Sequence, residues 1–210
     1  MTTKLMKGLN VIVILILVNV MWLIGTAVGL FIAGLTPSMV AAVKILRNPQ
    51  LFADYSSYFE LLKQFIREYI NAFRVYNWRI LIPSTIALLL YFDLLIIQGN
   101  ELLRAMLQWP LLILASYLFL SFINLIMAVD ISQESWIKKI KFALVAPILL
   151  PLQSICSLLM IVAFFVLVLA YNWLFFVAIS VLLYTMIRLL SSGYEQKGLL
   201  VVANETFAEI

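Results

Sequence analysis

Asp93 is the residue whose type and position most suggest chemistry. It lies within an apolar run, five residues before the predicted end of that run at Gln98. A carboxylate in the hydrocarbon region of a membrane is costly, so it marks either a functional site or a paired group. Candidate partners are Arg104, across a short polar turn, and Asn124 at a different depth. Three interpretations stay open: a structural pair, a ligand or coupling site, and a carboxylate that touches interfacial water.

Other side chains that carry chemistry are scarce. The sequence contains no histidine and one cysteine, Cys156, which removes the usual ligands of zinc, copper, haem and iron–sulfur clusters. No cluster of carboxylates and no nucleophile beside a base is visible. We therefore expect no metal site, no cofactor and no catalytic site, and we expect that the protein is not an enzyme.

Polar residues within the apolar runs form the remaining candidate set. They are Asn19, Asn124, Gln153 and Ser154. Amides and hydroxyls in membrane helices commonly form hydrogen bonds between helices, although a set of them can also line a polar path. The first interpretation is helix packing, and the second is a path for a solute.

The composition of the chain indicates which elements position these residues. Of 210 residues, 65% are hydrophobic and 11% are charged, whereas soluble domains contain about 25% charged residues. Uninterrupted apolar runs of about 18 residues or more mark membrane spans, and backbone pairing in lipid requires such runs to be helical. The sequence predicts an all-α, polytopic transmembrane bundle. Its excess of Lys and Arg, 14 against 10 acidic residues, indicates orientation in the bilayer and not binding to nucleic acid.

We predict one transmembrane domain over residues 1–210, with five full spans and a short returning helix. In chain order the elements are a span at 11–35, the short return helix at 37–48, an amphipathic helix at 51–75, spans at 76–98, 102–129, 140–170 and 173–190, and a cytoplasmic tail at 191–210. Pro147 and Pro151 are expected to kink the long span at 140–170.

The first span and the return helix are expected to form a hairpin that bends at Gly34–Pro37. Glycine and proline interrupt the first helix, Thr36 can cap the next one, and Pro37 suits its first turn. Ala41 and Ala42 are small enough for the returning helix to pack closely on the first.

The distribution of positive charge predicts that both termini are cytoplasmic. In the hairpin arrangement Arg104 lies outside, and the other thirteen of the 14 Lys and Arg residues lie inside, as the positive-inside rule favours. In the alternative five-span arrangement the return helix does not come back, and the amino terminus with Lys4 and Lys7 lies outside.

The segment at 51–75 combines charged and aromatic residues with helical periodicity. Apolar residues recur at intervals of three and four: Phe52, Tyr55, Phe59, Leu62, Ile66, Tyr69 and Phe73. Lys63, Arg67 and Arg74 make the polar side cationic. This pattern is typical of a helix that lies on the cytoplasmic leaflet, with its cations at anionic headgroups. A second interpretation is a docking helix for a cytoplasmic partner.

Motifs along the chain resemble the YesL-like family of bacterial membrane proteins. NVMWLIG, with Asn19 and Trp22, is similar to the family's Asn-x-x-Trp pattern, and a break with Pro37 precedes the small-residue helix SMVAAV. YFELLKQFIREYINAF, at 58–73, looks like the family's aromatic and Lys-rich stretch, and YFDLL, which contains Asp93, looks like its membrane-embedded Asp. The break reads GLTPSM where many members have Gly-Pro-Ala-Thr.

The resemblance implies a function, which the residues alone do not indicate. Members of this family, whose function is unknown, often occur beside carbohydrate ABC importers. We therefore expect a multi-pass plasma-membrane protein that acts as a nonenzymatic accessory or interaction subunit in carbohydrate uptake. Its expected partners are the lipid bilayer, an ABC importer or another membrane protein, and a second copy of itself. The alternative function is a small transporter or channel, acting as an oligomer.

Overall fold

The computed structural model describes residues 2–48, 58–76, 79, 81–131 and 135–198. Every regular element within these residues is a helix, which confirms the predicted all-α class. In chain order they are α1 (Thr2–Val28), α2 (Ile32–Leu46), α4 (Tyr58–Tyr76), α5 (Ile82–Gln98), α6 (Glu101–Ile131), α7 (Trp136–Leu149), α8 (Pro151–Ala170), the 3-10 turn η2 (Asn172–Leu174) and α9 (Phe175–Gln196).

Several of these helices are suited to a membrane. Four described stretches are long and apolar enough to cross one: Gly8–Val28, Glu101–Val129, Pro151–Ala170 and Asn172–Gln196. Ala33–Leu46 and Ile82–Gln98 are apolar but shorter. At 1.5 Å per residue, α5 is about 26 Å long, slightly less than a hydrocarbon core of about 30 Å. The chain is a membrane protein, and its five full crossings stay a prediction.

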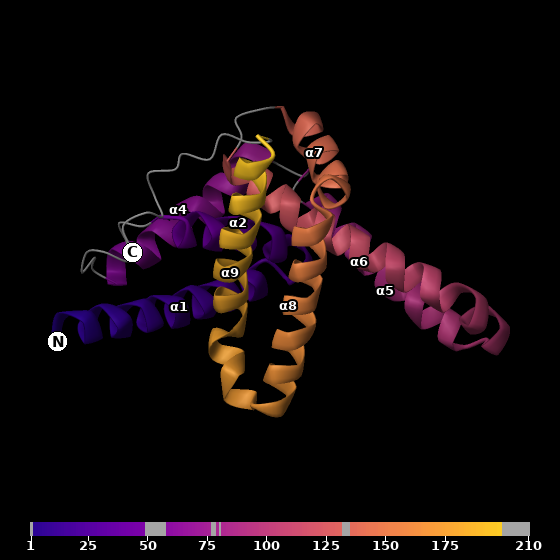
Figure 1. The fold of residues 1–210 in the computed structure, drawn as a ribbon, viewed down its shortest axis with the longest axis horizontal. Coiled ribbons are helices and arrows are strands. Elements are labelled where there is room, and N and C mark those ends of the chain that lie inside the picture. The colour runs from indigo at the N-terminus through magenta and orange to yellow at the C-terminus, as the bar shows by residue number, and fades with distance from the viewer. Residues whose placement is uncertain (1, 49–57, 77–78, 80, 132–134, 199–210) are drawn as a thin grey trace.

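The helices extend from a common centre in three directions (Figure 1). α1 and α4 extend to one side, α8 and α9 form an upright hairpin, and α5 and α6 form an arm on the opposite side. α2 packs against α1, α4, α5, α6 and α9, and its residues 40–43, 45 and 46 are buried. The short return helix is therefore the element on which these five helices assemble.

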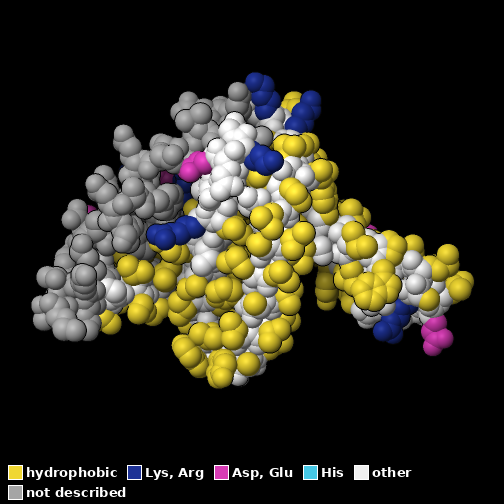
Figure 2. Space-filling view, viewed as in Figure 1, with side chains coloured by type: hydrophobic (Ala, Val, Ile, Leu, Met, Phe, Trp, Pro, Cys, Tyr) yellow, Lys and Arg dark blue, Asp and Glu magenta, His cyan; other side chains and the backbone are white. Residues whose placement is uncertain are grey.

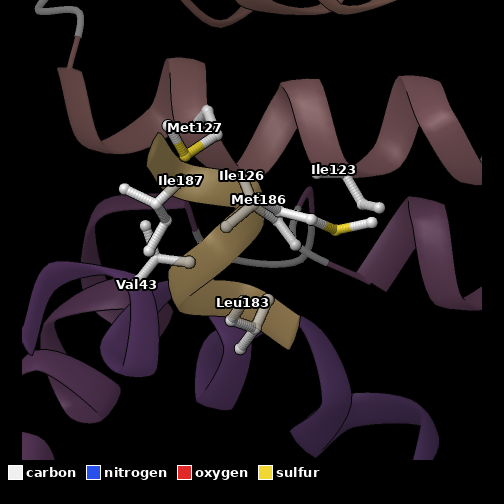
Figure 3. A pocket seen from close by; sticks show the side chains of 7 residues that line it. All are labelled: Val43, Ile123, Ile126, Met127, Leu183, Met186 and Ile187. Carbon is white, nitrogen blue, oxygen red and sulfur yellow. The ribbon is translucent and has the colours of Figure 1, made fainter. Parts of the chain in front are cut away.

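Side chains from α2, α6 and α9 close this centre (Figure 3). They surround a cavity of about 10 Å³ and are all apolar: Val43, Ile123, Ile126, Met127, Leu183, Met186 and Ile187. A space this small and without polar groups offers a water molecule no hydrogen-bond partner. The centre is packed like an ordinary core and is not part of a polar path.

The outer surface of the hairpin and of the arm is apolar. Figure 2 shows hydrophobic side chains covering α8, the lower part of α9 and the α5–α6 arm, with basic side chains near the start of α7 and charged side chains of both signs at the tip of the arm. Exposed apolar residues on α8 include Leu159 and Phe165. Such a surface requires lipid around it.

The α1–α2 hairpin is present, but its predicted bend at Gly34–Pro37 is wrong. α1 ends at Val28 and α2 begins at Ile32, so Pro37 lies inside α2 and Thr36 does not cap it. The predicted small residues Ala41 and Ala42 are both fully buried, as close packing of the hairpin requires.

The bend is earlier because two glycines allow the two backbones to touch. A Cβ atom added to Gly29 would lie 2.2 Å from the Cα of Gly34, which is sterically impossible. Leu30 and Phe31 complete the turn with positive φ angles of 54° and 61°, which are uncommon for residues that carry a Cβ atom.

The predicted span at 140–170 is two helices and not one kinked helix. α7 ends at Leu149, Leu150 has φ −120° and ψ 61°, and α8 begins at Pro151. Proline disfavours the α conformation in the residue before it, so Pro151 ends the first helix completely. Pro147 lies within α7 and does not interrupt it.

Two other predicted boundaries also shift. α5 begins at Ile82 and not at 76, because Pro83 suits the first turn of a helix. α9 continues to Gln196, so the residues at 191–196 that we expected in the tail are helical. Positions 51–57 of the amphipathic segment and 199–210 of the tail lie outside the described residues.

Candidate functional site

α4 is attached to the rest of the protein through one of its faces. Leu61, Phe65 and Ala72 are buried on this face, and α4 packs mainly on α2. The Nζ atom of Lys44 on α2 donates to the Oε2 atom of Glu68 at 2.7 Å. The hydroxyl of Tyr69 donates to the carbonyl oxygen of Gly25 on α1 at 3.0 Å. Partial burial raises the pKa of the Tyr69 phenol, which keeps it protonated as a donor.

Some of the apolar residues predicted to share one face of α4 pack against the core, and others are exposed at the surface. Tyr69 and Phe73 pack partly against the core. Phe59 is 72% exposed, and Leu62, Ile66 and Ile70 are exposed as well. These four residues, at intervals of three and four, form one exposed apolar row, here termed the α4 row.

A cationic strip lies beside the α4 row. Lys63 and Arg67 each follow a member of the row by one residue, which is a rotation of about 100° around the helix. Lys63, Arg67 and Arg74 are all exposed. An apolar row next to a strip of cations is suited to anionic lipid headgroups above hydrocarbon, or to an acidic, partly apolar protein surface.

The structure does not form the predicted pair of Asp93 and Arg104. Asp93 is exposed on α5, and no described residue forms a hydrogen bond or ion pair with it. The Nε atom of Arg104 donates to the Oε1 atom of Gln108 at 3.3 Å, one turn along α6. The Arg104 guanidinium lies along α6, its own helix. The short connection between α5 and α6 therefore does not bring the charges of Asp93 and Arg104 together.

Asn124 is the centre of a buried contact between α6 and α9. Its Nδ2 atom donates to the carbonyl oxygen of Leu120 at 2.8 Å, and its Oδ1 atom accepts from the hydroxyl of Tyr194 at 2.5 Å. Tyr194 is fully buried, and the sequence analysis missed it because it assigned this residue to the tail. The signal was its helical spacing from Ile187 and Leu190.

Asn19 lies where α1 meets α9, and Trp22 lies about one turn further along α1. Asn19 is fully buried, and its Nδ2 atom donates to the carbonyl oxygen of Phe175 at 3.0 Å. The Oδ1 atom of Asn19 and the Nε1 atom of Trp22 are buried without a hydrogen-bond partner among the described residues. Asn19, Asn124, Asp93 and the α4 row therefore belong to separate places in the fold and do not converge on one site.

Comparison with known proteins identifies the family of the first part of the chain. Residues 15–94 match the model of a family described as "Protein of unknown function, DUF624", which is the YesL family. Residues 15–94 belong to the YesL-like family. Neither the curated proteins nor the solved structures compared with this chain gave a match. The YesL-like segment includes α2 and α4 entirely, about half of α1 and most of α5.

Hydroxyl groups join the helices within the YesL-like segment. The Oγ1 atom of Thr26 on α1 lies 2.9 Å from the Oγ atom of Ser38 on α2. The Oγ1 atom of Thr36 lies 3.0 Å from the Oγ atom of Ser84 on α5. All four side chains are buried. These contacts replace the expected capping role of Thr36 and hold Pro37 between two interhelical hydrogen bonds.

The part of the chain that the structure describes contains no group of three His, Cys, Asp or Glu side chains placed to hold a metal ion. Cys156 is a free thiol on α8. α4 faces outward and is held rigidly through one of its faces. Its exposed surface combines charged with apolar side chains.

Proposed function

We propose that this chain is a nonenzymatic interaction subunit of the bacterial plasma membrane that assists carbohydrate uptake beside an ABC importer. The observation that carries the proposal is the geometry of α4. Lys44, Glu68 and Tyr69 attach one face of this helix to α1 and α2. The α4 row and its cationic strip stay exposed. A rigid helix with an exposed amphipathic surface is an efficient binding element, because little conformational entropy is lost on association.

In the proposed arrangement α4 rests on the cytoplasmic leaflet beside the importer. The α4 row contacts hydrocarbon and apolar side chains of the importer, and Lys63, Arg67 and Arg74 contact phosphates or acidic side chains. The link to carbohydrate uptake comes from the YesL-like resemblance. A small transporter or channel has less support, because the described centre is closed and apolar and the groove beside α5 is apolar.

Copurification from native membranes tests this proposal. The tagged full-length chain is solubilised from cells grown on the imported carbohydrate, and permease subunits of carbohydrate ABC importers are quantified by mass spectrometry. The double variant Phe59→Ser and Ile66→Ser is compared with Ile155→Ser and Leu159→Ser, which change exposed apolar residues on α8.

We expect the importer to copurify with the unaltered chain and with the α8 variant. Loss of two apolar anchors should reduce its recovery with the α4 variant by at least about tenfold. An importer that is absent from the unaltered chain, or that the α4 variant retains fully, contradicts the proposal.

A further inference from the structure

A groove lies between α5, α6 and α7, away from α4. Its volume is about 410 Å³, within the range of about 300–1,000 Å³ that is typical of small-molecule sites. Its walls are mainly aliphatic and aromatic, and include Ala87 on α5, Ala115 and Phe119 on α6, and Ile140 and Leu144 on α7. The occupant must therefore be largely apolar.

The size of the groove distinguishes between two apolar occupants. A partner helix is about 10–12 Å across, so a space of this volume would accommodate only about one of its turns. A hydrocarbon chain is far narrower and extends along the groove between the two helices of the arm. Because the arm presents an apolar surface that lipid must cover, a lipid chain is the available occupant of this shape.

One polar atom inside the groove requires a partner. Ser121 on α6 lines the groove and is only 5% exposed. Its Oγ atom has no hydrogen-bond partner among the described residues. A buried hydroxyl without a partner is costly, and an oxygen atom of a ligand that enters the groove can accept a hydrogen bond from it.

Cationic side chains lie at the same end of the groove as Ser121. α6 and α7 lie side by side and run in opposite directions, and the Tyr117 hydroxyl on α6 donates to the carbonyl oxygen of Leu144 on α7. One turn further along α6, Ser121 is therefore level with Ile140 and Lys141. Lys141 is exposed.

The α5 side of the groove has a cation of its own. Arg79 is exposed and precedes Ile82, the first residue of α5 and part of the groove wall, by three residues. Trp136, which also lines the groove, is a residue type that favours the membrane interface. The polar end of the groove thus combines cations, a hydroxyl and an interfacial aromatic residue.

We propose that this groove binds one anionic phospholipid. An acyl chain lies between α5 and α6, the phosphate lies near Lys141 and Arg79, and an ester oxygen accepts a hydrogen bond from Ser121. The proposal does not depend on the function proposed for α4, because none of its residues belongs to that helix.

Photocrosslinking tests the proposal with a defined probe. The full-length chain in detergent is mixed with phosphatidylglycerol that carries a diazirine in one acyl chain, irradiated, digested and analysed by mass spectrometry. Unlabelled phosphatidylglycerol and phosphatidylcholine compete with the probe. Ala115→Trp fills the groove, and Ala163→Trp, at an exposed position on α8, is the matched control.

We expect labels on the groove walls, and we expect phosphatidylglycerol to compete at least about fivefold more effectively than phosphatidylcholine, as for one cation near an anionic lipid. Ala115→Trp should abolish these labels, whereas Ala163→Trp should keep them. The double variant Lys141→Gln and Arg79→Gln should remove the preference for phosphatidylglycerol. Ser121→Ala should reduce the affinity for both lipids by about fivefold, which corresponds to the loss of one hydrogen bond.

Three results overturn the proposal. They are equal competition by the two lipids, labels confined to the outer surface of α8, and full groove labelling in a folded Ala115→Trp protein. If Ala115→Trp does not fold, Ala87→Trp fills the groove from the α5 side and is judged by the same criteria.

Discussion

Asp93 is an exposed polar residue, whereas Tyr194 is a buried one. Asp93 is exposed near the end of α5, where its carboxylate can reach interfacial water, and no described residue pairs with it. We predict that Asp93→Asn changes the free energy of unfolding by less than about 0.5 kcal/mol. Tyr194→Phe leaves the Oδ1 atom of Asn124 buried without its partner, and should cost about 1 kcal/mol.

Thermal unfolding of the purified chain in detergent measures both variants. Tyr171→Phe, at an exposed tyrosine, is the control for Tyr194→Phe. A large loss of stability in Asp93→Asn would indicate that this carboxylate has a structural partner after all.

Gly8 lies within α1, whereas Gly29 lies in the turn that follows it. The close approach of Gly29 to Gly34 leaves no room for a methyl group, whereas nothing lies within 4 Å of a Cβ atom added to Gly8. We predict that Gly29→Ala destabilises the chain by about 1–3 kcal/mol, and that Gly8→Ala stabilises it by about 0.5–1 kcal/mol. Equal unfolding temperatures for the two variants would show that the hairpin does not depend on this backbone contact.

At the scale of elements, α4 is expected to lie at the membrane interface. Nitroxide labels on Phe59→Cys, Ile66→Cys and Arg67→Cys, each in a Cys156→Ala background, report local access to oxygen and to a water-soluble nickel chelate. Because oxygen concentrates in lipid, we predict high oxygen access at Phe59 and Ile66 and high nickel access at Arg67. High nickel access at all three positions would place the α4 row in water and favour a protein partner alone.

For the whole molecule, the orientation in the membrane is the open prediction. The positive-inside rule places both termini in the cytoplasm and the tip of the α5–α6 arm outside. In a Cys156→Ala background, we expect a membrane-impermeant thiol reagent to label Asn100→Cys, at the tip of the arm, in intact cells. Thr3→Cys should be labelled only after lysis. Labelling of Thr3→Cys in intact cells would support the five-span alternative.

The sequence alone determined the class of the protein and the presence of most helices. Runs of apolar residues are constrained by the bilayer, which forces backbone groups to pair within each segment. Helix α6 consequently lies within two residues of its predicted limits of 102–129. Periodicity likewise revealed that α4 is an amphipathic helix, because positions three and four residues apart share a face. Local steric rules predicted a kink at Pro147 and Pro151, whereas the chain ends α7 at Leu149 and begins α8 at Pro151.

Only the tertiary structure decided how the helices meet. The bend of the α1–α2 hairpin depends on contact between Gly29 and Gly34, and Asn124 pairs with Tyr194 from a distant helix and not with Asp93. The groove beside Ser121 is formed by three helices together. Hydrogen bonds and close packing operate over a few ångströms between segments far apart in the chain, so spacing along the sequence does not specify them.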